Sequence, residues 1–405
     1  MNKRLYNIGR SLAVIALSLA TLTACEKDDK SNPTFQQPAE GSFILNVPGL
    51  AKGDNIYDLS KSESVSLTCT QPAYGMPLKT YYQVQVSLDE RFSNTDIEGV
   101  AYRTLKTSYN QATMHVDGVE LNKAVVKLYQ GSHNGADPSG IVMPIYIRLR
   151  AHVGVEINQL GWINSNVVKL PKVVASYVAT TPTEFFMRGT SIKGGKNAKE
   201  LGAIVGTKGE FTGLFYAAAG STFTFGDDED TGDGWSAIAT LNDNASAGLS
   251  EGDGGTVKVA NAGWYAVHFL NEVNEAENKL VTTLNIYPAH AYVIGQGCGG
   301  NWDDSNPAWE MIAPADASQP WVSPAFTGSG ELRAYIKLPG IEWWKTEYTL
   351  TGSKPKSITW RGVKYNINSN WKEDAGPSFS VAVEPGMKLF VDFDSDTGKV
   401  DTKWE

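Results

Sequence analysis

The sequence predicts an all-β protein built from β-sandwich domains in tandem. Apolar and polar residues alternate with a period of two over many short stretches, which is typical of half-buried strands. Turn residues separate these stretches at the spacing found in sandwich domains. Two segments in the second half of the chain share an opening strand and a closing hairpin, which indicates a repeated unit.

The first 24 residues are predicted to be a signal peptide that is no part of the fold. Lys3, Arg4 and Arg10 precede the apolar run Leu12–Ala20, which is shorter than the ~20 residues that a membrane-spanning helix needs. The run ends in Leu22-Thr23-Ala24-Cys25, which resembles a bacterial lipobox. This resemblance implies that Cys25 is lipidated and anchors the mature chain to a membrane. The alternative is an ordinary signal peptide that happens to precede a cysteine.

Residues 25–40 are predicted to form a flexible tether, because Pro33 and Pro38 lie among Ser, Asn and Gln. Near its start, Glu26-Lys27-Asp28-Asp29 resembles the signal that sends some lipoproteins to the outside of the outer membrane. A protein facing the cell exterior is therefore expected. The alternative is a linker whose charges merely keep it solvated.

The chain is acidic, with a formal net charge of −9 over 405 residues. Removal of the three basic residues of the signal peptide brings the mature chain to about −12. Because no long basic run is present, the chain is a poor candidate for binding nucleic acid or anionic lipid through charge.

Residues 41–172 are predicted to form an immunoglobulin-like sandwich. Alternating apolar residues place Cys69 in its core as a small apolar side chain. Leu121, Val125 and Leu128 fall at helical spacing, so a short helix is expected near them. Strands are expected around Phe43–Val47, Val65–Cys69, Tyr82–Leu88, Ile145–Arg150 and Val167–Leu170.

Motifs of this first domain resemble the N-terminal domain of the SusE/SusF family. They occur in family order as Phe43–Pro48, Ile56–Leu59, Gln71–Gly75, Tyr82–Leu88 and Phe92. One departure is Cys69, where the family commonly has an aromatic residue before the Gln-Pro pair. Family members are non-catalytic, glycan-binding surface lipoproteins of starch-utilisation-type systems. The resemblance therefore implies an outer-membrane protein that binds polysaccharide or oligosaccharide and assists a glycan transporter. The family's first domain is a spacer, which implies no ligand site there.

After a boundary near Pro171–Pro182, the sequence predicts two distant copies of one unit: residues 173–289 (the middle copy) and residues 290–405 (the last copy). The middle copy opens with Phe185–Gly189 and the last copy with Ala291–Gly295, and each closes with a strand, a Gly-containing turn and a strand. This arrangement resembles that of SusE/SusF proteins, in which sandwiches like those of carbohydrate-binding modules follow the spacer.

The last copy has the residues predicted to bind a ligand, since eight of the 11 Trp lie between Trp302 and Trp404. Along Glu331–Leu338, alternation puts Arg333, Tyr335 and Lys337 on one face and aliphatic residues on the other. A basic and aromatic face suits the lip of a binding site.

Two adjacent indoles, Trp343 and Trp344, follow this strand. In an extended chain adjacent side chains point to opposite faces, which makes Trp343 the expected platform and puts Trp344 on the apolar side. A bulged segment would instead expose both. Trp360 and Trp371 are further candidates, with a place in the core as the alternative for each.

A sugar is the ligand that such residues suit best. A pyranose has an apolar face of C–H groups that an indole covers, and Arg and Lys donate hydrogen bonds to its hydroxyls. The family resemblance adds a second platform in the loop after the opening strand, which is Trp302 here. The predicted site therefore has Trp302 and Trp343 as platforms and Arg333 and Lys337 as donors at its rim.

The middle copy looks poorer in binding residues. Trp235 takes roughly the place of Trp343, but the acidic loop Gly226–Asp233 replaces the basic residues. Clustered Asp oxygens suit calcium, yet their spacing does not match an EF-hand loop, and a solvated loop is favoured.

Signatures of catalysis are lacking in the sequence, so a non-enzymatic protein without cofactor or metal is expected. The five His are scattered without metal-ligand spacing, and no nucleophile elbow, phosphate loop or dinucleotide fingerprint is present. Two alternatives stay open. One is a glycoside hydrolase with accessory binding modules, because sequence does not give the separation of carboxylates. The other is a structural or adhesive surface protein without a sugar site.

Overall fold

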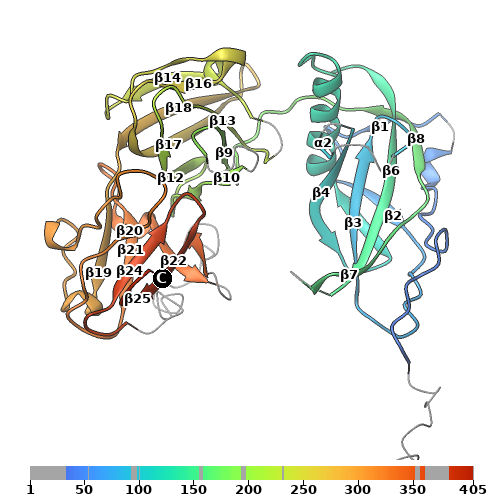
Figure 1. Ribbon diagram of the computed structural model, residues 1–405. Coiled ribbons are helices and arrows are strands. Elements are labelled where there is room, and N and C mark those ends of the chain that lie inside the picture. The colour runs from blue at the N-terminus through green and yellow to red at the C-terminus, as the bar shows by residue number, and fades with distance from the viewer. Residues whose placement is uncertain are drawn as a thin grey trace, which may run out of the picture. The chain divides into compact units, whose positions relative to one another are not determined.

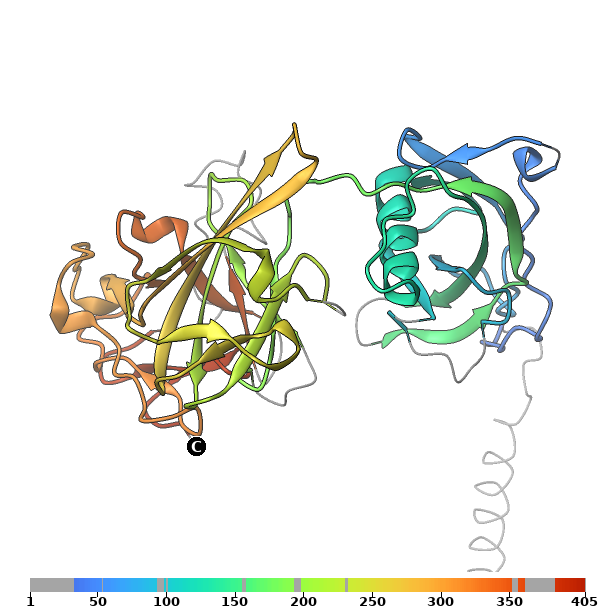
Figure 2. The same ribbon diagram turned by 90° about the horizontal axis from the view of Figure 1, so that it is seen from above.

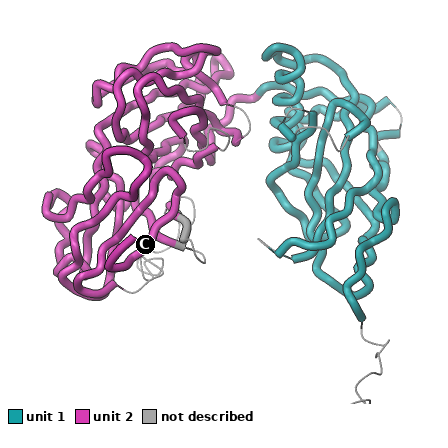
Figure 3. Tube along the Cα trace, viewed as in Figure 1, with its two compact units in different colours: residues 1–177 teal, residues 178–405 magenta. Residues whose placement is uncertain are grey.

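The computed structural model describes residues 33–404, apart from 53, 93–97, 100, 155–157, 193–197, 230–231, 352–355 and 361–382. The chain divides into two compact units, residues 1–177 (unit 1) and 178–405 (unit 2) (Figure 3). Strands dominate the described residues, which include a single α-helix, and the predicted all-β class is confirmed (Figure 1). No helix among the described residues is both long and apolar enough to cross a membrane.

Unit 1 is organised on a six-stranded sheet with the order β1-β8-β6-β3-β4, in which β7 also pairs with β6, and on a separate β2–β5 pair. Its strands are β1 Tyr57–Asp58, β2 Ser64–Thr68, β3 Thr80–Ser87, β4 Tyr102–Tyr109, β5 Thr113–Asp117, β6 Val142–Val153, β7 Leu160–Asn164 and β8 Val168–Val174. The strand expected over Phe43–Val47 is wrong, because this segment makes only a single bridge between Leu45 and Cys69. Cys69 is buried in the core, as the alternation predicts.

The predicted helix is present and longer than expected, as α2, Gly118–Ser132. It begins at Asp117, whose side chain accepts a hydrogen bond from the backbone N–H of Glu120 and so satisfies one of the first free donors of the helix. Leu121, Val125 and Leu128 form its buried face. Figure 2 shows α2 lying against one side of the strands of unit 1.

The middle copy is a sandwich of two five-stranded sheets with the orders β10-β9-β13-β16-β15 and β11-β12-β17-β18-β14. Aromatic side chains from both sheets, Phe225 on β13 and Phe269 on β17, meet in its core with ring centroids 4.9 Å apart. Its strands are β9 Phe186–Gly189, β10 Lys199–Glu200, β11 Gly202–Ala203, β12 Glu210–Ala217, β13 Thr222–Gly226, β14 Ile238–Asp243, β15 Leu249–Glu251, β16 Val257–Val259, β17 Gly263–Asn274 and β18 Lys279–Pro288.

The described strands of the last copy form one seven-stranded sheet with the order β19-β21-β22-β23-β25-β24-β20. Val293 on β19 and Trp321 on β20 belong to the same core cluster although they come from opposite ends of this order, so the sheet curls around its core. The strands are β19 Ala291–Gly295, β20 Trp321–Val322, β21 Leu332–Ile336, β22 Glu347–Thr351, β23 Lys356–Trp360, β24 Lys388–Asp392 and β25 Thr397–Asp401.

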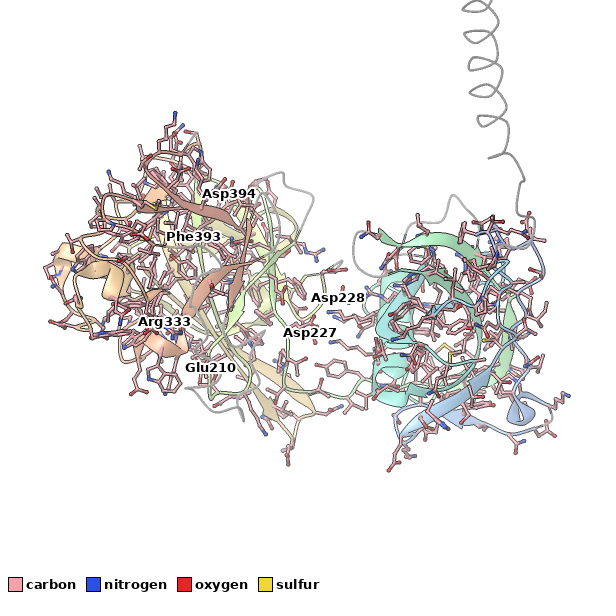
Figure 4. All side chains as sticks on the ribbon, turned by 90° about the horizontal axis from the view of Figure 1, so that it is seen from below. Glu210, Asp227, Asp228, Arg333, Phe393 and Asp394 are labelled. Atoms are coloured by element: carbon pink, nitrogen blue, oxygen red, sulfur yellow. The ribbon has the colours of Figure 1, made fainter. Side chains whose placement is uncertain are left out.

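Within unit 2 the two copies share contacts. The core cluster of the last copy includes Leu214 and Ala266 of the middle copy. Lys199 is buried, and its Nζ lies 2.6 Å from the Asp396 carboxylate and contacts the carbonyl oxygen of Phe393, which is labelled in Figure 4. Burial raises the pKa of Asp396, and Lys199 opposes this. The predicted division between residues 289 and 290 stays a proposal, since unit 2 is compact across it.

Candidate functional site

Four aromatic rings follow one another across the last copy, from Tyr292 on β19 through Tyr335 on β21 to Trp343 and Trp302. The centroid distances between successive rings are 5.7, 5.8 and 6.3 Å. Tyr292 and Tyr335 are cross-strand partners and stack at 16°, as neighbouring aromatic side chains in a sheet do. The structure thus brings together Trp302 and Trp343, which are distant from each other in the sequence.

Exposure is lowest at Tyr335 and increases from there toward Trp302, while Tyr292 at the other end of the row is half-buried. Tyr335 is 1% exposed, Trp343 is half-buried, and Trp302 is 45% exposed at the end of the row. Trp302 lies in the loop after the 3-10 helix η5, Gln296–Cys298. The row therefore has one buried ring, Tyr335, and at its Trp302 end an indole that a ligand can reach.

Trp343 and Trp344 belong to a 3-10 helix, η7, Trp343–Lys345, and the expected extended segment is wrong. Because a 3-10 helix has ~3 residues per turn, its successive side chains do not point to opposite faces. Both indoles are half-buried, and Lys345 Nζ lies 5.3 Å from the centre of the Trp344 ring. Strand geometry consequently gives no reason to place Trp344 in the core and Trp343 at the surface.

Lys337 lies beside the row of rings and is one third exposed. Its Nζ is 2.7 Å from Asp304 Oδ2 and also donates to the Asp304 carbonyl oxygen. The Tyr335 hydroxyl donates to the same carbonyl at 2.9 Å. Burial, followed by the nearby charge of Asp304, raises the pKa of Tyr335, so this phenol stays a hydrogen-bond donor. These bonds fix the loop that carries Trp302 against β21.

Arg333 does not lie at a rim, and its predicted position there is corrected by the structure. Its side chain is 4% exposed and lies between two carboxylates, with Nη2 2.5 Å from Glu331 and Nη1 2.9 Å from Glu347. Burial lowers the pKa of Arg333, but the two carboxylates outweigh this and raise it overall. Figure 4 shows Arg333 among the side chains of the last copy. Strand alternation placed it on the correct face, but that face is covered there.

The remaining predicted residues separate into one core residue and two that lie outside the described residues. Trp360 is 7% exposed and packs edge-on against Tyr348 at 5.5 Å, so its proposed role as a platform is corrected. A Cβ added to Gly202 of the middle copy would lie 2.4 Å from the Trp360 ring, which shows how closely that backbone approaches. Trp371 and the lipidation candidate Cys25 lie outside the described residues.

Strand register relates the middle copy to the last copy. Gly189 pairs with Phe223 as Gly295 pairs with Leu332. Both glycines have positive φ, 133° and 119°, and a Cβ at either would lie within 2.6 Å of a carbonyl oxygen on the neighbouring strand. Only glycine fits such a position, because the neighbouring backbone occupies the space of a side chain. The presence of this glycine at the same position in both segments supports the interpretation that they are copies of one unit.

At matching positions of this register, the middle copy lacks the buried arginine and the tyrosine ring of the last copy. Thr224 stands where the last copy has Arg333, and Gly226 stands where it has Tyr335. Trp235 opens a 3-10 helix, η3, Trp235–Ala237, as Trp343 opens η7, but it packs against the core of its own copy.

The acidic loop of the middle copy carries Asp227 and Asp228 (Figure 4), and the carbonyl oxygen of Asp228 accepts a hydrogen bond from Arg188. The described residues contain no group of three or more His, Cys, Asp or Glu arranged to hold a metal ion.

Sequence reasoning missed the supports of the site. The backbone N–H of Val205, in the middle copy, donates to the carbonyl oxygen of Lys345 at 3.0 Å and so holds the end of η7. Glu310 accepts hydrogen bonds from the Tyr292 hydroxyl and pairs with His290. No local pattern predicts these contacts, because each joins residues that are distant in sequence or unremarkable in type.

Two family models match separate parts of this chain. Residues 290–399 match the family model described as SusF/SusE starch specific CBMs, and residues 27–136 match that described as SusE outer membrane protein. A curated relative, Outer membrane protein SusF of Bacteroides thetaiotaomicron, is 26% identical over 269 residues, which are 60% of this chain and 51% of the relative. The chain thus spans about half the length of that relative. The crystal structure of SusF from the same organism aligns with a TM-score of 0.44 and 16% identity, covering 90% of this chain and 100% of that one.

Proposed function

We propose that this chain, which is a protein of the SusE/SusF type, binds starch-type glucan without cleaving it, on the platform made by Trp302 and Trp343. The observation that carries the proposal is the pair of indole rings 6.3 Å apart with the Lys337 ammonium beside them. All three residues lie within the segment that matches the starch-specific family model.

Stacking gives this site its affinity. Each indole covers the apolar face of a sugar ring and loses little conformational entropy, because an aromatic side chain has few rotatable bonds. By analogy with nucleobases, each stacked ring contributes ~1–3 kcal/mol. Two platforms with a few polar contacts correspond to a Kd of roughly millimolar to micromolar.

Binding without hydrolysis fits the state of the carboxylates around the platform. Asp304 pairs with Lys337, Glu331 and Glu347 pair with Arg333, and Glu310 pairs with His290. Glycoside hydrolysis uses two carboxyl groups that flank the bond to be broken, one of them protonated. Each of these four carboxylates is instead engaged by a side chain of the protein itself, which restricts the positions that it can take beside a glycosidic bond.

The proposed setting is the outer membrane, since one of the two matching family models describes an outer membrane protein. A lipid on Cys25 would anchor the chain, and residues 25–40 would tether it on the exterior face beside a glycan transporter. Several weak sites displayed on tethered chains retain a polysaccharide better than one site in solution.

Affinity electrophoresis of the purified mature chain in gels containing soluble starch tests the proposal. The unaltered chain is expected to be retarded without releasing sugar. Trp343→Ala should lose most of the retardation, with a Kd about 5- to 150-fold higher, because it removes ~1–3 kcal/mol of stacking. Trp162→Ala, which removes a half-buried indole of unit 1, serves as the matched control and should be retarded normally.

Three outcomes would contradict the proposal. Release of sugar by the unaltered chain would make it a glycoside hydrolase. Absence of retardation would favour a structural or adhesive surface protein, and normal retardation of Trp343→Ala would show that the platform lies elsewhere.

A further inference from the structure

A cavity of about 540 Å³ lies next to the row of rings, where the end of the middle copy meets the last copy. Pro288, at the end of β18, and Leu338, Pro339 and Ile341, which follow β21, give it largely apolar walls. Its volume is within the ~300–1,000 Å³ typical of sites for small molecules. Neither Trp302 nor Trp343 lines it, so the cavity is distinct from the platform.

The cavity nevertheless adjoins the platform through residues beside it. Asp304 and Lys337, whose ion pair stands beside the rings, also line the cavity. Glu342 lines it as well and directly precedes Trp343. A chain molecule that lies on Trp343 and extends past Lys337 would therefore enter the cavity.

The charges around the cavity favour a neutral occupant. Three basic side chains in or beside its lining each have a carboxylate partner: Lys337 with Asp304 at 2.7 Å, His290 with Glu310 at 2.5 Å, and Lys345 with Glu342 at 3.3 Å. Paired charges offer donors and acceptors for hydroxyl groups but little net field to attract an ion. Apolar walls with a few polar groups at the edge match a sugar ring, which has a C–H face and a hydroxyl rim.

We infer that this cavity is a second subsite, which binds a further neutral sugar unit of the same glucan chain beyond the unit stacked on the platform. The inference rests on the proposed function. It adds that recognition extends along the chain, so affinity rises with the length of the oligosaccharide until both places are filled.

Isothermal titration calorimetry of the mature chain with maltose and maltoheptaose tests the subsite. The unaltered chain should bind maltoheptaose at least about tenfold more tightly than maltose, a difference of ~1.4 kcal/mol. His290→Trp places a large ring at the cavity and should reduce this ratio to about threefold or less. The matched control is His115→Trp, at an exposed position on β5 of unit 1, which should keep the ratio of the unaltered chain.

A second variant is needed because His290→Trp also removes the His290–Glu310 pair, which could itself change binding. Pro288→Trp enters the cavity from the middle copy, where Pro288 is exposed, and should lower the ratio in the same way. Near-ultraviolet circular dichroism identifies variants that have kept their fold. If both folded variants keep the ratio of the unaltered chain while Trp343→Ala abolishes binding, the cavity is no subsite and the proposed function stands. If the unaltered chain binds neither sugar, both are overturned.

Discussion

At matching register positions, the middle copy has Thr224 and Gly226 where the last copy has Arg333 and Tyr335. Both copies keep a glycine where the opening strand closely approaches the backbone of its neighbour, and both place a Trp at the start of a 3-10 helix. The frame is thus shared, whereas the inner aromatic ring and the buried cation are found in the last copy. A binding site in this fold depends on a few side chains added to a common frame.

The two copies also differ in what surrounds their Trp residues. Trp343 stands between Tyr335 and Trp302 in a row of rings, and Trp235 packs against the core of the middle copy. In addition, the middle copy supports the last copy through Val205, which holds η7, and through Gly202, against which Trp360 packs. We interpret the middle copy as a support for the site rather than as a second site.

The largest expected effect comes from Trp360→Ala, at the contact between the two copies. Removing a buried indole leaves a cavity and should lower the free energy of unfolding by ~3–5 kcal/mol. Urea denaturation followed by tryptophan fluorescence measures it, with Trp343→Ala as the control that should lose less than about half as much. An unchanged stability accompanied by a loss of starch binding would make Trp360 a platform after all.

A smaller loss is expected from Arg333→Thr, which gives the last copy the residue found in the middle copy. Glu331 and Glu347 would be left without their cation, and removing one partner of a buried ion pair costs ~3–5 kcal/mol. Because Glu331 is one third exposed and can regain water, about 2–3 kcal/mol is the expected loss here.

Thermal unfolding and starch retardation of this variant should be measured together. The expected result is a lower Tm with retardation that persists below it. If the variant is stable but no longer binds starch, Arg333 contacts the sugar at the rim of the site.

The smallest effect on binding is expected from Trp235→Ala in the middle copy. If that copy is only a support, the Kd for maltoheptaose should change by less than about twofold, well below the ~1–3 kcal/mol expected for a stacking ring. Calorimetry against Trp343→Ala gives the contrast directly. Equal losses in the two variants would show that both copies bind sugar.

Much of the fold could be predicted because its signals are local. Period-two alternation located β2, β3, β6 and β8, and helical spacing located α2. The pattern failed over Phe43–Val47, where Phe43 and Leu45 are buried but Val47 is exposed, and where one isolated bridge between Leu45 and Cys69 stands in place of a regular strand. Apolar alternation indicates which side chains are buried. It does not indicate whether the backbone forms a regular ladder of hydrogen bonds with a neighbouring strand.

For the site, the sequence identified the correct strand, but it predicted the wrong exposure for side chains on that strand. Alternation correctly put Arg333, Tyr335 and Lys337 on one face of β21. It could not tell that carboxylates cover Arg333 and that the loop of Asp304 covers Tyr335, because these partners come from other parts of the chain. The adjacent Trp343 and Trp344 were predicted to point to opposite faces because an extended strand was expected. They lie in a 3-10 helix, to which that geometry does not apply.

By itself, the sequence determined which residue types the protein concentrates in its last quarter and the periodicities that make its strands. Those properties follow from local chemistry, since side-chain pattern and turn residues act over a few positions. Tertiary structure decided which of the Trp residues meet. Trp302 and Trp343 approach each other because the Lys337–Asp304 pair fixes one loop and a backbone hydrogen bond from Val205 fixes η7, whereas close packing against Gly202 takes Trp360 into the core. Exposure is set by distant segments of chain, and no local pattern carries that information.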